Sequence, residues 1–391
     1  MSAPIAPLLS RRDVIAGCAA LGLATAADAA GEPGLAEVAA RRGILFGSAV
    51  AWGGQGSDTG SFANPRYAAL LERDCAVLVP ENELKWQATR PGPRLFDFAR
   101  MDAIADYATD RHMRLRGHTL FWVPPQWYPD WLRDHDFGSR PAQAVEAMLV
   151  EHVRTVCARY GSRIFSYDVV NEAIQPETGA IRDTVVTKAL GGEAMLDLLF
   201  HSARAEAPHA QLVYNDYMSW ERGTEDESHI RGVLKLLEGF RKRNTPVDAL
   251  GVQSHIRLLK SDPVAAIVKE SAGPWRRFLD EVVAMGFDLV ITEFDVNDRK
   301  APADIAARDG AVADYAQAYL DIMFSYPQLR EMLVWGLSDR YSWLEGFDPR
   351  ADKLPKRGLP YDREFRAKPL RSAIARALAG APRREPLRPA G

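Results

Sequence analysis

The sequence predicts one (β/α)₈ barrel, the TIM-barrel fold of the α/β class. Short runs rich in β-branched residues alternate with helix-like segments, as a parallel sheet with crossover helices requires. The unit repeats eight times at intervals of about 40 residues, and this count favours closure into a barrel. No Gly-rich phosphate loop follows the first strand, which disfavours an open dinucleotide-binding sheet.

The expected strands are short and mostly apolar, as buried parallel strands are. In chain order they are Ile44–Val50, Ala76–Val79, Met113–Leu120, Ile164–Val170, Gln211–Tyr214, Asp248–Gln253, Phe287–Thr292 and Met332–Leu337.

Segments with helical apolar periodicity lie between and after these strands. They are Pro65–Arg73, Met101–Arg111, Pro141–Tyr160, Ala194–Ala207, Glu225–Lys242, Pro274–Met285, Pro302–Phe324 and Pro369–Ala379. The prolines that open four of them are assigned to first turns, where a residue without an N–H is tolerated. Residues 30–43 are a lead-in and residues 44–380 the barrel. The Pro- and Arg-rich residues 381–391 are expected to form a disordered tail.

Composition excludes several classes of protein. A hydrophobic content of 47% is too high for a disordered chain. A net charge of −3 gives no positive electrostatic field that would attract the backbone of a nucleic acid. Three cysteines are too few for a small secreted protein that is stabilised by disulfide bonds. We expect Cys75 and Cys157 to be buried free thiols, although one disulfide between them stays open. The sequence indicates no assembly, so a monomer is expected.

Residues 1–29 have the pattern of a twin-arginine (Tat) signal peptide. Arg11 and Arg12 precede a weakly apolar stretch, and Ala27-Asp28-Ala29 has the small residues of a cleavage site. An amphipathic helix and a lipobox ending at Cys18 are the disfavoured alternatives. We therefore expect export to the periplasm or beyond, with the Tat machinery as a transient partner and no stable membrane anchor.

Polar side chains gather where the predicted strands end, which is the catalytic face of such barrels. Buried polar groups are costly in a core, so this clustering indicates a site. The strand-end residues are Glu81, Asn82, His118, Asn171, Glu172, Asn215, Asp216, Gln253, His255, Glu293, Asp295 and Trp335.

Glu172 and Glu293 are 121 residues apart, which places them on strands four and seven across one barrel mouth. Paired carboxyl groups are what glycoside cleavage needs, because one must donate a proton while the other is ionised. Flat aromatic residues would bury the apolar faces of a sugar.

The chain resembles glycoside hydrolase family 10 endo-β-1,4-xylanases, of the retaining clan A type. The resemblance rests on seven motifs in the family order, which together cover nearly all of residues 44–375. They are VPENELKW (79–86), RGHTLFW (116–122), YDVVNEA (167–173), LVYNDY (212–217), GVQSHI (251–256), VITEFDV (290–296) and VWGLSDRYSW (334–343).

The resemblance implies roles for individual residues. Glu172 resembles the acid/base and Glu293 the nucleophile. Asn171 would bind the sugar 2-hydroxyl, while His255, fixed by Asp295, would orient the nucleophile. The residues implied to bind substrate are Glu81, Asn82, Lys85, His118, Trp122, Gln253, Trp335 and Trp343. The implied substrates are xylan and xylo-oligosaccharides, with no cofactor or metal.

The third motif departs from the family pattern. Trp122 is followed by Val123-Pro124-Pro125-Gln126, with two extra residues, where the family often has tryptophan-histidine-x-glutamine. A family-type polar contact is therefore missing or supplied by Gln126. Tyr167 replaces a common tryptophan. Both departures affect subsite affinities rather than the class of reaction.

Other functions stay open as alternatives. A β-1,4-glucanase or an exo-acting xylosidase of the same clan would share the motifs. A metal-dependent barrel hydrolase would need clustered histidines, and strand one has none. A non-catalytic carbohydrate-binding barrel would not require both Glu172 and Glu293. Asp295, Asn297 and Asp298 mimic a calcium loop, but the glycine and distal glutamate of such a loop are absent.

Overall fold

The computed structural model describes residues 31–221, 223–258 and 263–387. By the contacts within the chain, residues 34–391 form one compact unit and the residues before them another. The predicted signal peptide, residues 1–29, lies outside the described residues. In the described part of the chain, no helix has the length and hydropathy needed to cross a membrane.

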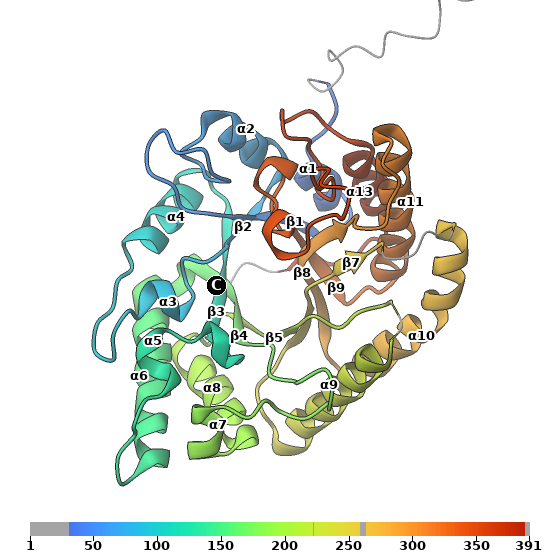
Figure 1. The fold of residues 1–391 in the computed structure, drawn as a ribbon. Coiled ribbons are helices and arrows are strands. Elements are labelled where there is room, and N and C mark those ends of the chain that lie inside the picture. Colours follow the sequence, from blue (N-terminus) through green and yellow to red (C-terminus); the bar gives the residue numbers. More distant parts are fainter. Residues whose placement is uncertain (1–30, 222, 259–262, 388–391) are drawn as a thin grey trace, which may run out of the picture. The chain divides into compact units, whose positions relative to one another are not determined.

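Eight parallel strands form a closed barrel (Figure 1). They are β1 (Leu45–Val50), β2 (Val77–Pro80), β3 (Arg114–Trp122), β4 (Ile164–Asn171), β5 (Gln211–Asp216), β6 (Ala249–Val252), β8 (Asp288–Asn297) and β9 (Leu329–Val334). The pairings of β1 with β9 and of β6 with β8 close the barrel. The predicted (β/α)₈ fold is therefore confirmed.

Several bounds of the predicted strands are wrong, among them the end of β8, which runs to Asn297 rather than Thr292 and so includes Glu293. The last strand ends at Val334 rather than Leu337, so Trp335 follows the strand. A further short strand, β7 (His255–Arg257), extends the edge of β8. Ser254 has a left-handed φ of 62°, which turns the chain away from β6 before β7 begins.

Helices surround the strands (Figure 1). The longer ones are α2 (Pro65–Asp74), α4 (Ala99–Asp110), α6 (Pro141–Tyr160), α8 (Gly192–Glu206), α9 (Thr224–Arg243), α10 (Val264–Ala284), α11 (Ile305–Phe324) and α13 (Pro369–Gly380). The shorter ones are α1 (Leu35–Ala40), α3 (Trp86–Thr89), α5 (Asp130–Arg133), α7 (Val185–Leu190) and α12 (Leu344–Phe347), with 3₁₀ turns η2 (Pro125–Trp127), η3 (Gly161–Arg163) and η4 (Asp339–Tyr341).

Two of the four prolines do not open helices. Pro274 lies inside α10, which begins at Val264. A proline removes one helical hydrogen bond, but α10 buries side chains on both sides of it, with Ile267 before the proline and Trp275 after it. Pro302 precedes α11, whose first turn is capped by Asp304 accepting from the Ala307 N–H at 2.9 Å.

Two apolar layers stabilise the barrel. The larger layer lies between strands and helices. The smaller fills the barrel interior with Ala49, Val77, Val79, Phe165, Val213, Ala249, Val290, Leu333 and Trp335. Cys75 and Cys157 are buried free thiols in the larger layer, as expected. Both layers hold the strand ends rigidly in place, which a site built from several strands requires.

Residues 381–387 of the predicted tail are held by hydrogen bonds, while residues 388–391 lie outside the described residues. Arg384 donates to the carbonyl oxygens of Phe324 at 2.9 Å and Tyr326 at 3.1 Å, and also to that of Leu329. Its backbone N–H donates to Arg42 at 3.1 Å. The guanidinium thus satisfies carbonyl groups between the end of α11 and the start of β9, and so orders this segment.

Candidate active site

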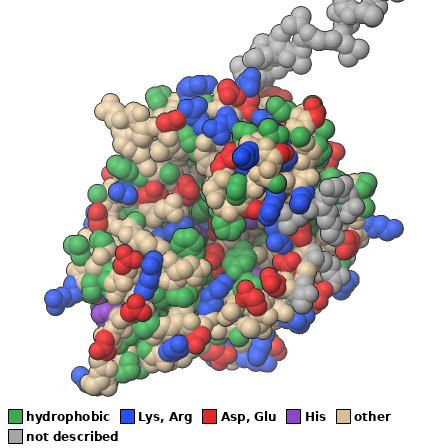
Figure 2. Space-filling view, in the orientation of Figure 1, with side chains coloured by type: hydrophobic (Ala, Val, Ile, Leu, Met, Phe, Trp, Pro, Cys, Tyr) green, Lys and Arg blue, Asp and Glu red, His purple; other side chains and the backbone are tan. Residues whose placement is uncertain are grey.

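The predicted site residues lie around the carboxyl ends of the strands. Asn171 ends β4 and Glu172 follows it, while Glu293 and Asp295 lie within β8. The space-filling view shows this face hollowed near its centre, with acidic and hydrophobic side chains beside one another (Figure 2).

Three amide side chains connect the two glutamates. Gln253 Nε2 donates to Glu172 Oε1 at 2.9 Å and to Asn171 Oδ1 at 3.2 Å. Asn215 Nδ2 donates to the same Asn171 oxygen at 2.9 Å and to Glu293 Oε1 at 2.7 Å. One hydrogen-bonded network therefore fixes both carboxyl groups.

Glu293 is held as a carboxylate. Its Oε2 lies 3.3 Å from His255 Nε2, and His118 Nδ1 is 4.0 Å from its other oxygen. Burial alone would raise the pKa of Glu293, but His118, His255 and Lys85 outweigh burial and lower it to about 2. A buried carboxylate that stays ionised is suited to nucleophilic attack.

His255 bridges Glu293 and a second carboxylate. Its Nδ1 lies 3.0 Å from Asp295 Oδ1, and Trp343 Nε1 donates to the other Asp295 oxygen at 2.7 Å. Burial alone would lower the pKa of His255, but Asp295 and Glu293 raise it to about 10. The imidazolium so formed stabilises the charge on Glu293.

Glu172 is in the opposite electrostatic situation. Burial raises its pKa and nearby Asp216 and Glu293 act in the same direction, while the hydrogen bond from Gln253 and the neighbouring Trp122 indole offset only part of the rise. Its backbone is left-handed, with φ 58°, and its N–H donates to the Asn215 carbonyl at 2.9 Å. A carboxyl group with a raised pKa is suited to proton donation.

A chain of charges runs from His118 into the barrel interior. His118 Nδ1 lies 2.9 Å from Asp168 Oδ2, and Arg116 binds the other Asp168 oxygen at 2.6 Å. Arg116 Nε is also 2.9 Å from Glu331. The contact with Asp168 fixes the orientation of the His118 ring, whose same Nδ1 atom lies 4.0 Å from Glu293 Oε1.

The residues implied to bind sugars lie beside the glutamates. Lys85 Nζ donates to Asn82 Oδ1 at 3.0 Å and lies 4.5 Å from the centre of the Trp122 ring. Lys85 Nζ is also 5.8 Å from the centre of the Trp335 ring. Burial raises the pKa of Glu81, only partly offset by Lys85. On the opposite side, the Trp343 ring is 4.9 Å from that of His255.

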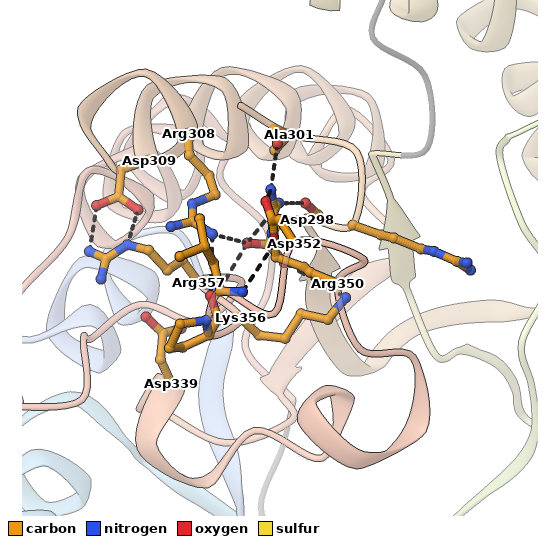
Figure 3. A network of polar contacts seen from close by, with 12 residues as sticks. Asp298, Ala301, Arg308, Asp309, Asp339, Arg350, Asp352, Lys356 and Arg357 are labelled. Carbon is orange, nitrogen blue, oxygen red and sulfur yellow. Dashed lines mark hydrogen bonds and ion pairs between the residues drawn. The ribbon is translucent and has the colours of Figure 1, made fainter. Parts of the chain in front are cut away.

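A buried ionic network supports the segment that follows β8 (Figure 3). Arg308, Arg350 and Lys356 converge on Asp298 at 3.6, 3.8 and 3.8 Å. Lys356 Nζ also donates to Asn297 Oδ1 at 2.7 Å. The network ties the end of β8 to residues 350–357, beyond the segment that carries Trp343. It explains the polar residues after Asp295 without a calcium ion.

The sequence places Asn215 at a strand end but indicates no role for it. Its central position appears only in three dimensions, because its partners come from β4 and β8. Thr292 Oγ1 donates to Asn215 Oδ1 at 2.7 Å, which fixes the amide orientation. Gln126, considered as a replacement for a family contact, is exposed. Among the described residues, no group of three potential metal ligands occurs.

The fold and the site together define a class. A closed parallel barrel whose mouth holds two networked carboxyl groups with oppositely shifted pKa values is a barrel glycoside hydrolase. The family model "Glycosyl hydrolase family 10" matches residues 34–377, and the chain belongs to this family.

Curated relatives and solved structures agree with this assignment. The chain is 30% identical over 353 residues to endo-1,4-beta-xylanase 1 of Humicola insolens, covering 88% of this chain and 74% of that protein. It is 30% identical over 292 residues to endo-1,4-beta-xylanase 1 of Gibberella zeae, covering 75% and 77%. Native xylanase 10B from Thermotoga maritima superposes with a TM-score of 0.74 at 26% identity, over 88% of this chain and 98% of that one. Xylanase 10B from Thermotoga petrophila in complex with xylobiose gives 0.75 at 26% identity, over 89% and 97%.

Proposed function

We propose that this protein is a retaining endo-1,4-β-xylanase in which Glu293 is the nucleophile and Glu172 the acid/base. The observation that carries this assignment is the opposite shift of the two pKa values within one amide network. Family membership and the xylanase names of the relatives support xylan as substrate. The glucanase, exo-xylosidase, metal-dependent and non-catalytic alternatives have no comparable support.

The first step breaks the glycosidic bond. A Glu293 carboxylate oxygen attacks the anomeric carbon while the bond to the leaving oxygen breaks, and Glu172 transfers its proton to that oxygen. The products are a free sugar chain end and an ester between Glu293 and the remaining xylosyl unit. Asn171, held by Asn215 and Gln253, is positioned to bind the sugar 2-hydroxyl as charge develops.

The second step restores the enzyme. Glu172, now a carboxylate, takes a proton from water as the water oxygen attacks the anomeric carbon. The ester bond to Glu293 breaks and the carboxylate is regenerated. Two inversions at one carbon give net retention.

The aromatic residues supply binding to the sugar faces. Trp335 and Trp343 flank His255, and their rings lie 6.4 and 4.9 Å from the imidazole. Glu81, Asn82 and Lys85 provide polar groups for hydroxyls on the side of β2. The chain is further proposed to reach the periplasm or the exterior through the Tat route. Replacing Arg11-Arg12 with Lys-Lys should then leave the protein in the cytoplasm.

One assay tests the reaction and the alternatives together. We expect the enzyme to reduce the viscosity of linear xylan rapidly, with little action on β-1,4-glucan and no loss of rate after chelation. NMR should show the β-anomer as the first product. Release of xylose alone would indicate exo action, and the α-anomer first would exclude a double displacement.

A further inference from the structure

Trp127 is the most exposed tryptophan in the described chain, with 45% of its surface accessible. It lies in η2, within the segment where the sequence departs from the family pattern after Trp122. An exposed indole leaves a large apolar ring face in contact with water. An exposed tryptophan beside an active site is therefore a candidate for ligand binding.

The Trp127 ring extends the wall of the catalytic cleft. It stacks on Trp122 with ring centres 4.9 Å apart and an angle of 8° between the planes. Trp122 in turn lies beside Glu172, whose pKa it helps to lower, and under the Lys85 ammonium group. The two parallel indoles therefore form a layered aromatic wall that leads outward from the proposed acid/base.

The segment that carries Trp127 is held in place. Pro125 opens η2, and the Trp127 N–H donates to the Pro124 carbonyl at 3.0 Å. Gln87 donates its side-chain amide to the Trp127 carbonyl. Arg133 donates to the carbonyl groups of Gln126 and Tyr128, both at 3.2 Å. The indole is thus presented by a braced turn, which reduces the entropy lost when a ligand binds.

These observations favour one ligand. A xylopyranose ring lacks an exocyclic CH₂OH group and presents flat C–H faces, which stack on an indole. We propose that Trp127 forms an additional sugar-binding subsite, which holds the xylan backbone beyond Trp122. This inference rests on the proposed xylanase function and extends it to the binding of longer chains.

The test compares a long and a short substrate. With Trp127→Ala we expect a roughly ten-fold loss of kcat/KM on xylohexaose, carried mainly by KM, since one aromatic contact is removed. The kcat/KM of this variant on a short aryl β-xylobioside should be unchanged. Trp127→Tyr should restore most of the loss on xylohexaose. Leu95→Ala, which removes another exposed apolar side chain (60% accessible), should alter neither value.

Two results would overturn the subsite. Equal losses on both substrates, with a lower melting temperature, would mean that Trp127 only supports the Trp122 ring. Unchanged kinetics on both substrates would mean that no sugar binds there. If the parent enzyme cleaves neither substrate, the proposed function fails, and calorimetric titration of xylohexaose into the parent and Trp127→Ala proteins still tests the subsite. Equal affinities would then exclude it.

Discussion

Asn215 donates its side-chain amide to Glu293 Oε1 at 2.7 Å and to Asn171 Oδ1 at 2.9 Å, so it links the proposed nucleophile to Asn171. The amide is fixed from behind by Thr292, so it has no freedom to turn away. We predict that Asn215→Asp lowers kcat on xylan by roughly 10- to 100-fold, the size of a lost hydrogen bond to a charged group. Steady-state kinetics measure this, and an unchanged kcat would contradict the role.

Asp295 should control the acidic limit of activity through His255. Asp295 is a main cause of the raised pKa of His255, and His255 helps to lower the pKa of Glu293. Asp295→Asn should therefore lower the pKa of His255 and raise the pKa of Glu293. The carboxylate of Glu293 is active only above its own pKa, so the acidic limb of kcat/KM should move to higher pH. The pH profile with an activated aryl xylobioside measures the shift, since that leaving group needs no proton. A profile with an unmoved acidic limb would contradict the coupling.

Glu172→Ala should affect substrates according to their leaving groups. A poor leaving group needs the proton from Glu172, whose pKa burial raises. The rate on xylan should fall by roughly 10²- to 10⁴-fold, the usual contribution of a general acid. Formation of the glycosyl-enzyme from a dinitrophenyl xylobioside should change little, as measured by the burst of released phenol. Equal losses in both reactions would exclude Glu172 as the acid.

Arg384 should contribute to stability and not to catalysis. It donates to backbone carbonyl groups of Phe324, Tyr326 and Leu329 near the start of β9. Arg384→Ala should lower the free energy of unfolding by about 2 kcal/mol. Arg383 is exposed and makes one bond of 3.3 Å to Arg41, so Arg383→Ala is the matched control and should cost less than about 0.5 kcal/mol. Denaturant unfolding measures both, and equal effects would contradict the proposed role of Arg384.

The sequence predicted the repeating elements well because their signals are local. Helix α6 has the predicted bounds, with a proline in its first turn and Gly161 at its end. Helix α10 was predicted too short, because Pro274 is a start signal by itself and only tertiary packing carries the helix through it. The left-handed turn at Ser254 has no comparable signal, so β7 was missed.

The candidate site divides in the same way. Motifs indicate Glu172 and Glu293 as candidate catalytic residues, since each has a distinctive local sequence. Asn215 was not assigned because its role depends on residues from two other strands. The stacking of Trp127 on Trp122 depends on the path of a proline-rich turn, which no periodicity describes.

The central claim is that Glu293 forms a covalent bond to the sugar. A 2-deoxy-2-fluoro-xylobioside with a good leaving group slows both steps but lets the first proceed, so the ester should accumulate. Mass spectrometry of digested protein should place the fluoro-xylobiosyl group on the peptide that contains Glu293, and on that residue. A label on Glu172, or steady turnover without any labelled peptide, would contradict the assignment.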